Sequence, residues 1–199
     1  MTTLARARRP WSALLLLLAS AGVCSGQAPD AKPAPQGETG GGKVTTVFLI
    51  RHAERGQEPA QDPPLTEAGR ARAEALARLL SDAGVKAVYT SQFARTRQTA
   101  EPLAKLLGVP VNAVALSVKP ESPREVSEQS IRELKGKIEG HAGGAVLIVG
   151  HTNSVPPLIR ELGGDVVPTM DESRYDDLFV VTVYAAGRAK VLHLKYGAP

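Results

Sequence analysis

Four side chains could carry out chemistry together: Arg51, His52, Arg95 and His151. A guanidinium group can bind two phosphate oxygens at once and stays charged at any working pH. A neutral imidazole nitrogen can act as a nucleophile toward phosphorus. Two guanidiniums and two imidazoles around one oxyanion would therefore both bind a phosphate dianion and react with it. With this much positive charge, the reaction requires no metal ion and no other cofactor.

These residues follow segments that are typical of buried strands. Arg51 and His52 come directly after the apolar, β-branched run 44–50, and Gly150-His151 comes directly after the run 145–149. A buried strand rarely ends on unpaired charged groups unless that end faces a ligand, and ligands bind at the carboxyl ends of strands in open α/β sheets. Arg95 stands near the start of a helix, where backbone N–H groups favour an anion. We therefore expect the four groups to meet at one edge of the sheet.

The elements that would position these groups alternate between strands and helices. This order predicts an α/β fold with a mostly parallel central sheet covered by helices. The predicted strands are 44–50, 85–90, 145–149 and a weak one at 111–118, and 177–184 with 188–196 form a hairpin at one sheet edge. Helices are predicted from Thr66, over 94–107, over 122–139 and over 157–162. The third helix begins at an apparent capping box, Ser122-Pro123-Arg124-Glu125.

The first residues have the layout of a secretory signal peptide, with a basic segment followed by the apolar stretch 11–23. That stretch is too short to span a bilayer comfortably. We predict a signal peptide over 1–24, a flexible Gly/Pro-rich linker over 25–43 and one folded domain over 44–199. Cys24 is either the lipidated first residue of a bacterial lipoprotein or an incidental cysteine of the leader. The expected location is outside the cytoplasm, either periplasmic, anchored by lipid to the envelope, or secreted.

Charge and composition argue against nucleic acid as a partner. The chain has a formal net charge of +4, but Arg6, Arg8 and Arg9 supply three of these charges within the leader, so the remainder carries only +1. A nearly neutral domain with few aromatic residues is not expected to bind nucleic acid. Cys24 is the only cysteine, so the predicted domain contains no disulfide bond.

At the chemistry-bearing residues the sequence resembles the histidine phosphatase superfamily, the phosphoglycerate mutase-like group. The resemblance covers residues 44–196 and is carried by Arg51-His52-Ala53-Glu54, Leu65-Thr66-Glu67-Ala68-Gly69, Thr90-Ser91, Arg95-Thr96, Gln98-Thr99-Ala100 and Gly150-His151. It implies a three-layer α/β/α sandwich. It also implies that His52 becomes phosphorylated, that Arg51, Arg95 and His151 hold the phosphoryl group, and that water then regenerates the enzyme.

The resemblance leaves the proton donor unassigned. Many family members carry a carboxylic acid in an insertion after the third strand, but here that region is short and offers only Glu121 and Glu125, outside any motif. Glu54 is an alternative because it lies close to His52 in the sequence. If no acid is present, substrates with good leaving groups are favoured, because an unprotonated alkoxide leaves poorly.

Other polar residues are interpreted as structural. Arg55 and Arg97 are expected to be surface or rim charges, and His141 and His193 to be structural or exposed. The segment Tyr175-Asp176-Asp177 either lines the pocket or forms a turn before a strand, and the turn is the preferred interpretation.

The predicted function is a metal-independent phosphomonoester hydrolase that acts on a small phosphorylated molecule or a phosphorylated envelope component. Two alternatives are phosphoryl transfer of the phosphoglycerate mutase type and a catalytically inactive phosphate-binding module. The mutase role fits an exported protein poorly, because glycolytic intermediates are cytoplasmic. The sequence predicts neither the substrate nor the oligomeric state.

Overall fold

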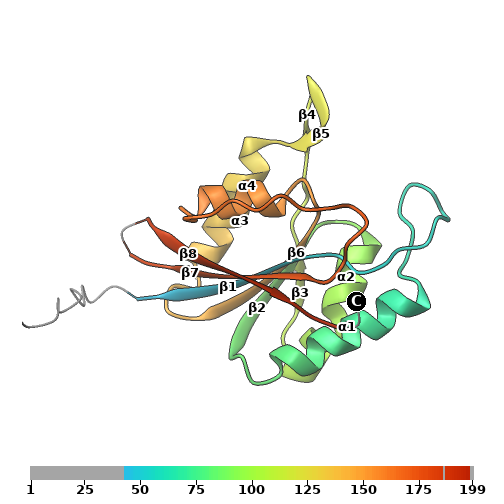
Figure 1. Ribbon diagram of the computed structural model, residues 1–199, viewed down its shortest axis with the longest axis horizontal. Helices are drawn as coiled ribbons and strands as arrows, with labels where there is room; N and C mark the ends of the chain where they lie inside the picture. The colour runs from blue at the N-terminus through green and yellow to red at the C-terminus, as the bar shows by residue number, and fades with distance from the viewer. Residues whose placement is uncertain (1–42, 186, 198–199) are drawn as a thin grey trace, which may run out of the picture. The chain divides into compact units, whose positions relative to one another are not determined.

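A computed structural model describes residues 43–185 and 187–197, which form a six-stranded sheet covered by helices (Figure 1). The predicted leader, Cys24 and the predicted linker up to residue 42 lie outside the described residues. The boundaries of these segments therefore stay predictions. Over the part of the chain that the structure describes, no helix has the length and apolar character needed to cross a membrane.

The sheet has the strand order β3-β2-β6-β1-β7-β8. Its strands are β1 (Thr45–Arg51), β2 (Val85–Thr90), β3 (Val111–Ala113), β6 (Ala145–Gly150), β7 (Asp177–Val183) and β8 (Ala189–Lys195). The first four strands of this order are parallel to one another, β7 pairs antiparallel to β1, and β8 pairs antiparallel to β7. The helices are α1 (Glu67–Leu80), α2 (Ala94–Leu107), α3 (Glu128–Glu139) and α4 (Val155–Glu161).

The predicted fold class is confirmed, including the three layers of the α/β/α sandwich. Helices α1 and α2 cover one face of the sheet and α3 and α4 cover the other (Figure 1). Successive side chains of β1 point to opposite faces of the sheet. Val47 and Leu49 pack against α3 and α4, whereas Phe48 and Ile50 pack against α1 and α2. Because both faces of β1 are buried, its sequence is a continuous apolar run and does not alternate with polar residues.

Strand register brings the ends of β1, β2 and β6 to the same level. Arg51 of β1 lies opposite Gly150 of β6, and Thr90 of β2 lies opposite Val149 of β6. The residue that follows each of these strands therefore emerges at the same sheet edge. His52 and His151 are the next residues after Arg51 and Gly150, so the register alone makes them neighbours.

The predicted helix start at Ser122 is wrong. Ser122–Val126 is strand β5, which pairs with the short strand β4 (Val118–Lys119) in a hairpin separate from the main sheet. The Ser122 hydroxyl donates to the Glu125 carboxylate instead of capping a helix, and Ser127 is the true N-cap of α3, accepting from the Ser130 N–H. The helical apolar spacing of Ile131, Leu134 and Ile138 begins only after Ser127, and this is the signal that decides between the two caps.

The loop after β1 is held against helix α1 by very close packing. The Glu54 carbonyl accepts hydrogen bonds from the Thr66 N–H at 2.9 Å and the Thr66 hydroxyl at 3.3 Å. A Cβ at Gly69 would lie 2.1 Å from the same carbonyl oxygen, so only glycine permits this approach. The Leu65-Thr66-Glu67-Ala68-Gly69 segment therefore fixes the backbone that follows His52.

Substitution of Gly69 tests this packing. We expect Gly69→Ala to lower the free energy of unfolding by about 2 kcal/mol or more, because the new Cβ must push the backbone carbonyl aside. Gly136→Ala is the matched control, because a Cβ at Gly136 in α3 has no atom within 4 Å. Removing that helical glycine should raise the free energy of unfolding by about 0.5–1 kcal/mol. Urea denaturation measures both, and an unchanged stability in Gly69→Ala would contradict the packing.

Candidate active site

The two predicted site histidines meet at the carboxyl edge of the sheet. The rings of His52 and His151 lie 5.3 Å apart between centroids, in an edge-to-face arrangement. Both line a cavity of about 590 Å³ that Arg51 and Arg95 also line. The structure therefore brings together all four residues that the sequence predicts.

The tautomer of His52 is set by the backbone. Its Nδ1 lies 2.7 Å from the carbonyl oxygen of Ala53, and because a carbonyl can only accept, Nδ1 carries the proton. The lone pair is therefore on Nε2. The Ala53 N–H in turn donates to the Thr99 hydroxyl at 2.9 Å, and that hydroxyl donates to the Arg95 carbonyl at 2.7 Å. Thr99 thus couples the backbone beside His52 to the first turn of α2.

His151 is held by hydroxyl groups on both sides. The Ser154 hydroxyl accepts from the His151 N–H at 2.9 Å, and a Cβ at Gly150 would lie 2.6 Å from that hydroxyl. The glycine of the Gly150-His151 pair therefore lets Ser154 fold back onto the strand end. The ring Nε2 lies 2.8 Å from the hydroxyl of the buried Ser91, which follows β2. Ser154 thus holds the backbone of His151, and Ser91 orients its ring.

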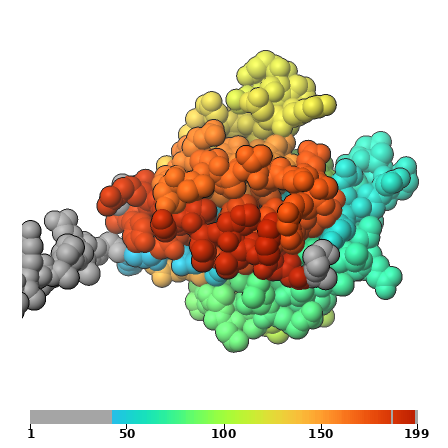
Figure 2. All heavy atoms as spheres, in the orientation of Figure 1, coloured from blue at the N-terminus to red at the C-terminus, as the bar shows by residue number. Residues whose placement is uncertain are grey.

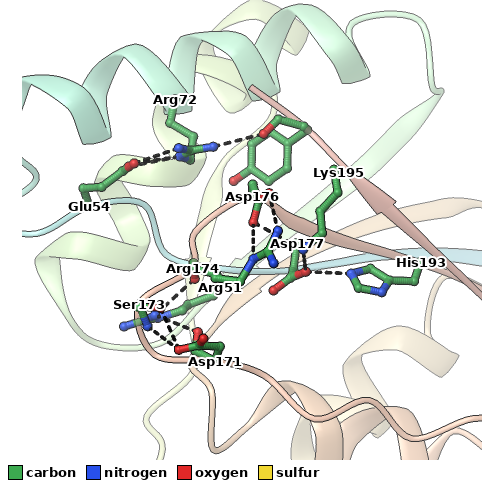
Figure 3. A network of polar contacts seen from close by, with 11 residues as sticks. Arg51, Glu54, Arg72, Asp171, Ser173, Arg174, Asp176, Asp177, His193 and Lys195 are labelled. Carbon is green, nitrogen blue, oxygen red and sulfur yellow. Dashed lines mark hydrogen bonds and ion pairs between the residues drawn. The ribbon is translucent and has the colours of Figure 1, made fainter. Parts of the chain in front are cut away.

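Arg51 is oriented by the segment 171–175. Its Nη1 donates to the carbonyl oxygens of Glu172, Arg174 (3.2 Å) and Asp171 (3.5 Å), as Figure 3 shows in part. Its guanidinium carbon lies 4.3 Å from the centroid of the Tyr175 ring, and that ring lies 6.0 Å from the His52 ring. These contacts use one terminal nitrogen, so Nε and Nη2 are the Arg51 donors to expect on an oxyanion.

Arg95 projects from the first turn of α2 into the same cavity. Its guanidinium carbon lies 4.2 Å from the centroid of the Phe93 ring, and its Nη1 lies 3.8 Å from the Asp62 carboxylate. The Asp62 carboxylate also accepts from the Ala94 N–H at 2.8 and 3.1 Å, so it caps α2 from the loop after β1. The Nε of Arg95 is buried and has no hydrogen-bond partner among the described residues. A ligand acceptor would complete this guanidinium.

Burial and like charge keep both imidazoles neutral. Burial is the largest cause that lowers the pKa of His52 to about 3, with smaller contributions from the charges of Arg51, Arg95 and Arg55. Burial likewise lowers the pKa of His151 to about 3, followed by the effect of the adjacent His52. Burial also lowers the pKa of Arg51 and of Arg95, yet a guanidinium remains charged at neutral pH. The site therefore combines uncharged nucleophilic rings with fixed positive charge.

The carboxylates that could supply a proton are mostly engaged elsewhere. Glu54 forms a bidentate ion pair with Arg72 of α1 at 2.8–3.1 Å, shown in Figure 3, and Glu125 pairs with Lys119 at 2.8 Å. Glu121, at the tip of the hairpin, does not line the cavity. Of the described residues that line it, Glu172 alone bears a carboxylate. Sequence reasoning missed Glu172, which lies outside every motif.

Of the other polar residues, only Tyr175 differs from its preferred interpretation. Arg55 is exposed and lines the cavity, as expected of a rim charge, whereas Tyr175 contacts both Arg51 and His52 although a turn was the preferred interpretation. No spacing signal in the sequence identifies these Tyr175 contacts. His141 hydrogen-bonds the Tyr89 hydroxyl at 2.9 Å, and His193 pairs with Asp177, so both have structural contacts outside the cavity. Arg97 is exposed and donates to the Gln92 carbonyl at 2.6 Å.

No group of three or more His, Cys, Asp or Glu side chains within residues 43–185 and 187–197 is arranged to hold a metal ion.

Comparison with known sequences matches part of the chain. The family model described as "Histidine phosphatase superfamily (branch 1)" matches residues 47–116, which include Arg51, His52 and Arg95. Over 68 residues the chain is 37% identical to the probable phosphoglycerate mutase GpmB of Photorhabdus laumondii subsp. laumondii. That match covers 31% of this chain and 32% of the relative, so it spans about a third of the relative's length.

Solved structures share the fold over most of their length. The protein histidine phosphatase SixA complexed with tungstate superposes with a TM-score of 0.60 at 22% identity, covering 75% of this chain and 96% of that one. The phosphoglycerate mutase of Bacillus anthracis str. Sterne gives 0.61 at 19% identity, covering 77% and 93%. The mycobacterial glucosyl-3-phosphoglycerate phosphatase gives 0.56 at 15% identity, covering 79% and 100%. At these identities the likeness shows the fold alone.

Titration of the two site histidines tests the electrostatics. We expect the Hε1 resonances of His52 and His151, assigned by single substitutions, to show neutral rings down to about pH 4, well below the usual midpoint near 6.5. Since their folded-state pKa values are lowered, protonation favours the unfolded chain. Their contribution to the free energy of unfolding is thus complete above about pH 6.5 and is lost as the pH falls toward 3. A midpoint above pH 6 for either ring would contradict this site.

Proposed function

We propose, on the premise that the chain belongs to the histidine phosphatase superfamily, that it is a phosphomonoester hydrolase working through a phosphohistidine on His52. One observation supports this most strongly. The proton of His52 is held on Nδ1 by the Ala53 carbonyl, so the unprotonated Nε2 belongs to a ring that lines a cavity with Arg51 and Arg95. A neutral nucleophile beside two fixed cations is what attack on a phosphate dianion requires.

In the first step, the His52 Nε2 lone pair forms a bond to phosphorus while the ester P–O bond breaks. The Nδ1–H stays on the ring, which becomes positively charged, and the Ala53 carbonyl stabilises that charge as a hydrogen-bond acceptor. The equatorial oxygens receive donors from Arg51, Arg95 and His151. The leaving alkoxide takes a proton from water or from a carboxylic acid.

In the second step, water attacks phosphorus from the side that the alcohol has left. The P–N bond breaks, its electron pair returns to Nε2, and the neutral imidazole is restored. Both protons of the water leave with the phosphate, so the charge balances. The guanidiniums again stabilise the equatorial oxygens, and because they are already in position they need no reorganisation at the moment of reaction.

Leaving-group quality decides between substrates. Glu54 and Glu125 are occupied by ion pairs, which leaves Glu172 as the one lining carboxylate among the described residues. With a single lining carboxylate available, we expect phosphomonoesters whose leaving group departs readily to be favoured over simple alkyl esters. Mutase-type transfer would use the same phosphohistidine with a second hydroxyl in place of water. A binding module without turnover would use the same cavity.

We also propose that the domain acts outside the cytoplasm, as the leader over 1–24 predicts. Its substrate would then be a small phosphorylated molecule or a phosphorylated envelope component. Cell fractionation of the full-length chain, with a Cys24→Ser variant to test lipid attachment, measures this directly. Recovery of all the protein in the cytoplasm would contradict the proposal.

The nucleophile is tested by substitution and trapping. We expect His52→Ala to lower phosphate release from an aryl phosphate by roughly 10³-fold or more, since the covalent route is lost. Acid-sensitive phosphate should be found on His52 by mass spectrometry after a rapid quench, and EDTA should leave the rate unchanged. The control His141→Asn changes a histidine outside the cavity and should keep wild-type activity. Equal rates in wild type and His52→Ala would contradict the mechanism.

A further inference from the structure

The cavity has a second wall that the phosphoryl chemistry does not use. Its volume of about 590 Å³ lies within the roughly 300–1,000 Å³ of small-molecule sites, and one phosphoryl group fills only a small part of such a space. The second wall is formed by the β4–β5 hairpin and the segment before it: Leu116, Val118, Pro123, Arg124 and Val126. The hairpin stands out from the α3 and α4 side of the sheet (Figure 1) and projects from the surface in Figure 2.

Most of this wall is apolar. Leu116, Val118, Pro123 and Val126 contribute aliphatic surface, and Val118 is 47% exposed. Leu116 is held in place by Gln92, whose amide donates to the Leu116 carbonyl at 3.1 Å and accepts from the Leu116 N–H at 2.9 Å. Gln92 directly follows Ser91, so the apolar wall is fixed to the segment that orients His151.

One cation belongs to the wall. The carbonyl of Arg124 accepts from the Asn153 side-chain amide at 2.8 Å, which ties the hairpin to the loop directly after His151. The Arg124 side chain is exposed and, among the described residues, makes no hydrogen bond or ion pair. Its neighbour Glu125 is paired with Lys119 and Ser122 instead. A free guanidinium on a cavity wall is suited to bind a carboxylate or a phosphate.

We propose that this wall binds the alcohol portion of the substrate, and that this portion combines an apolar body with an anionic group bound by Arg124. The inference rests on the proposed function. The cavity then has two anion sites on different elements. Arg51 of β1 and Arg95 of α2 bind the transferred phosphoryl group. Arg124 of the hairpin binds the second anion. The apolar side chains between them contact the body of the substrate.

Matched aryl phosphates test the proposal. 4-(2-Carboxyethyl)phenyl phosphate and 4-propylphenyl phosphate have similar size and phenols of similar acidity, so they differ mainly in the distal carboxylate. We expect the carboxylate probe to have a kcat/KM about tenfold higher or more, because one charge-assisted contact is gained. Arg124→Gln should bring the ratio of the two kcat/KM values close to one, and Arg124→Lys should keep part of the preference.

Arg97→Gln is the matched control. It removes an exposed charge two residues after Arg95 but outside the cavity, so the substrate ratio should stay at its wild-type value. A wild-type ratio near one would overturn the proposal. So would a preference that survives Arg124→Gln, or one that disappears equally in Arg97→Gln, because the latter would show only a diffuse charge effect.

Binding of non-hydrolysable analogues separates this inference from the proposed function. Calorimetry with the two matching aryl phosphonates should give about tenfold tighter binding for the carboxylate analogue, and this difference should be lost in Arg124→Gln. If the binding preference is present but no aryl phosphate is hydrolysed, the proposed function fails and the second anion site stands. If hydrolysis depends on His52 but both phosphonates bind equally, the second anion site fails alone.

Discussion

The site depends on the register between β1 and β6. These strands lie side by side and parallel, with Arg51 opposite Gly150, so the first residues beyond them are necessarily neighbours. The backbone N–H of His52 donates to the Gly150 carbonyl at 3.0 Å, which extends the ladder by one bond to the proposed nucleophile. A shift of one residue would turn His52 to the other face and disrupt both apolar clusters at once. The packing of the core and the geometry of the candidate site are therefore set by the same constraint.

Around this pair, the structure offsets the cost of holding cations and imidazoles in a partly buried space. Backbone carbonyls of the segment before β7 accept from Arg51, the Asp62 carboxylate lies near Arg95, and hydroxyls of Ser91 and Ser154 bind His151. That segment is itself braced by the Arg174–Asp176 ion pair, at 3.1 Å, visible in Figure 3. Because these side chains are already held by hydrogen bonds, they lose little conformational freedom when a ligand binds.

The sequence was sufficient for the parts of the fold that depend on local pattern. Continuous apolar runs correctly predicted strands β1 and β6. The polar residues that follow these runs correctly predicted that Arg51, His52 and His151 lie at the same sheet edge. It was insufficient where two local signals competed, as at Ser122 and Ser127, where only apolar spacing after the cap distinguishes a hairpin from a helix. It was also insufficient for residues whose role comes from tertiary approach. Glu54 and Glu172 are both acidic, and only the fold shows that Arg72 occupies the first while the second lines the cavity.

The central claim is that one oxyanion is held between His52 and the surrounding cations, and a crystal structure with orthovanadate tests it most directly. We predict vanadium bonded to Nε2 of His52, with its equatorial oxygens in contact with Arg51, Arg95 and His151. Vanadate bonded to a different nitrogen would contradict the account, and so would vanadate bound at full occupancy elsewhere with none in this cavity.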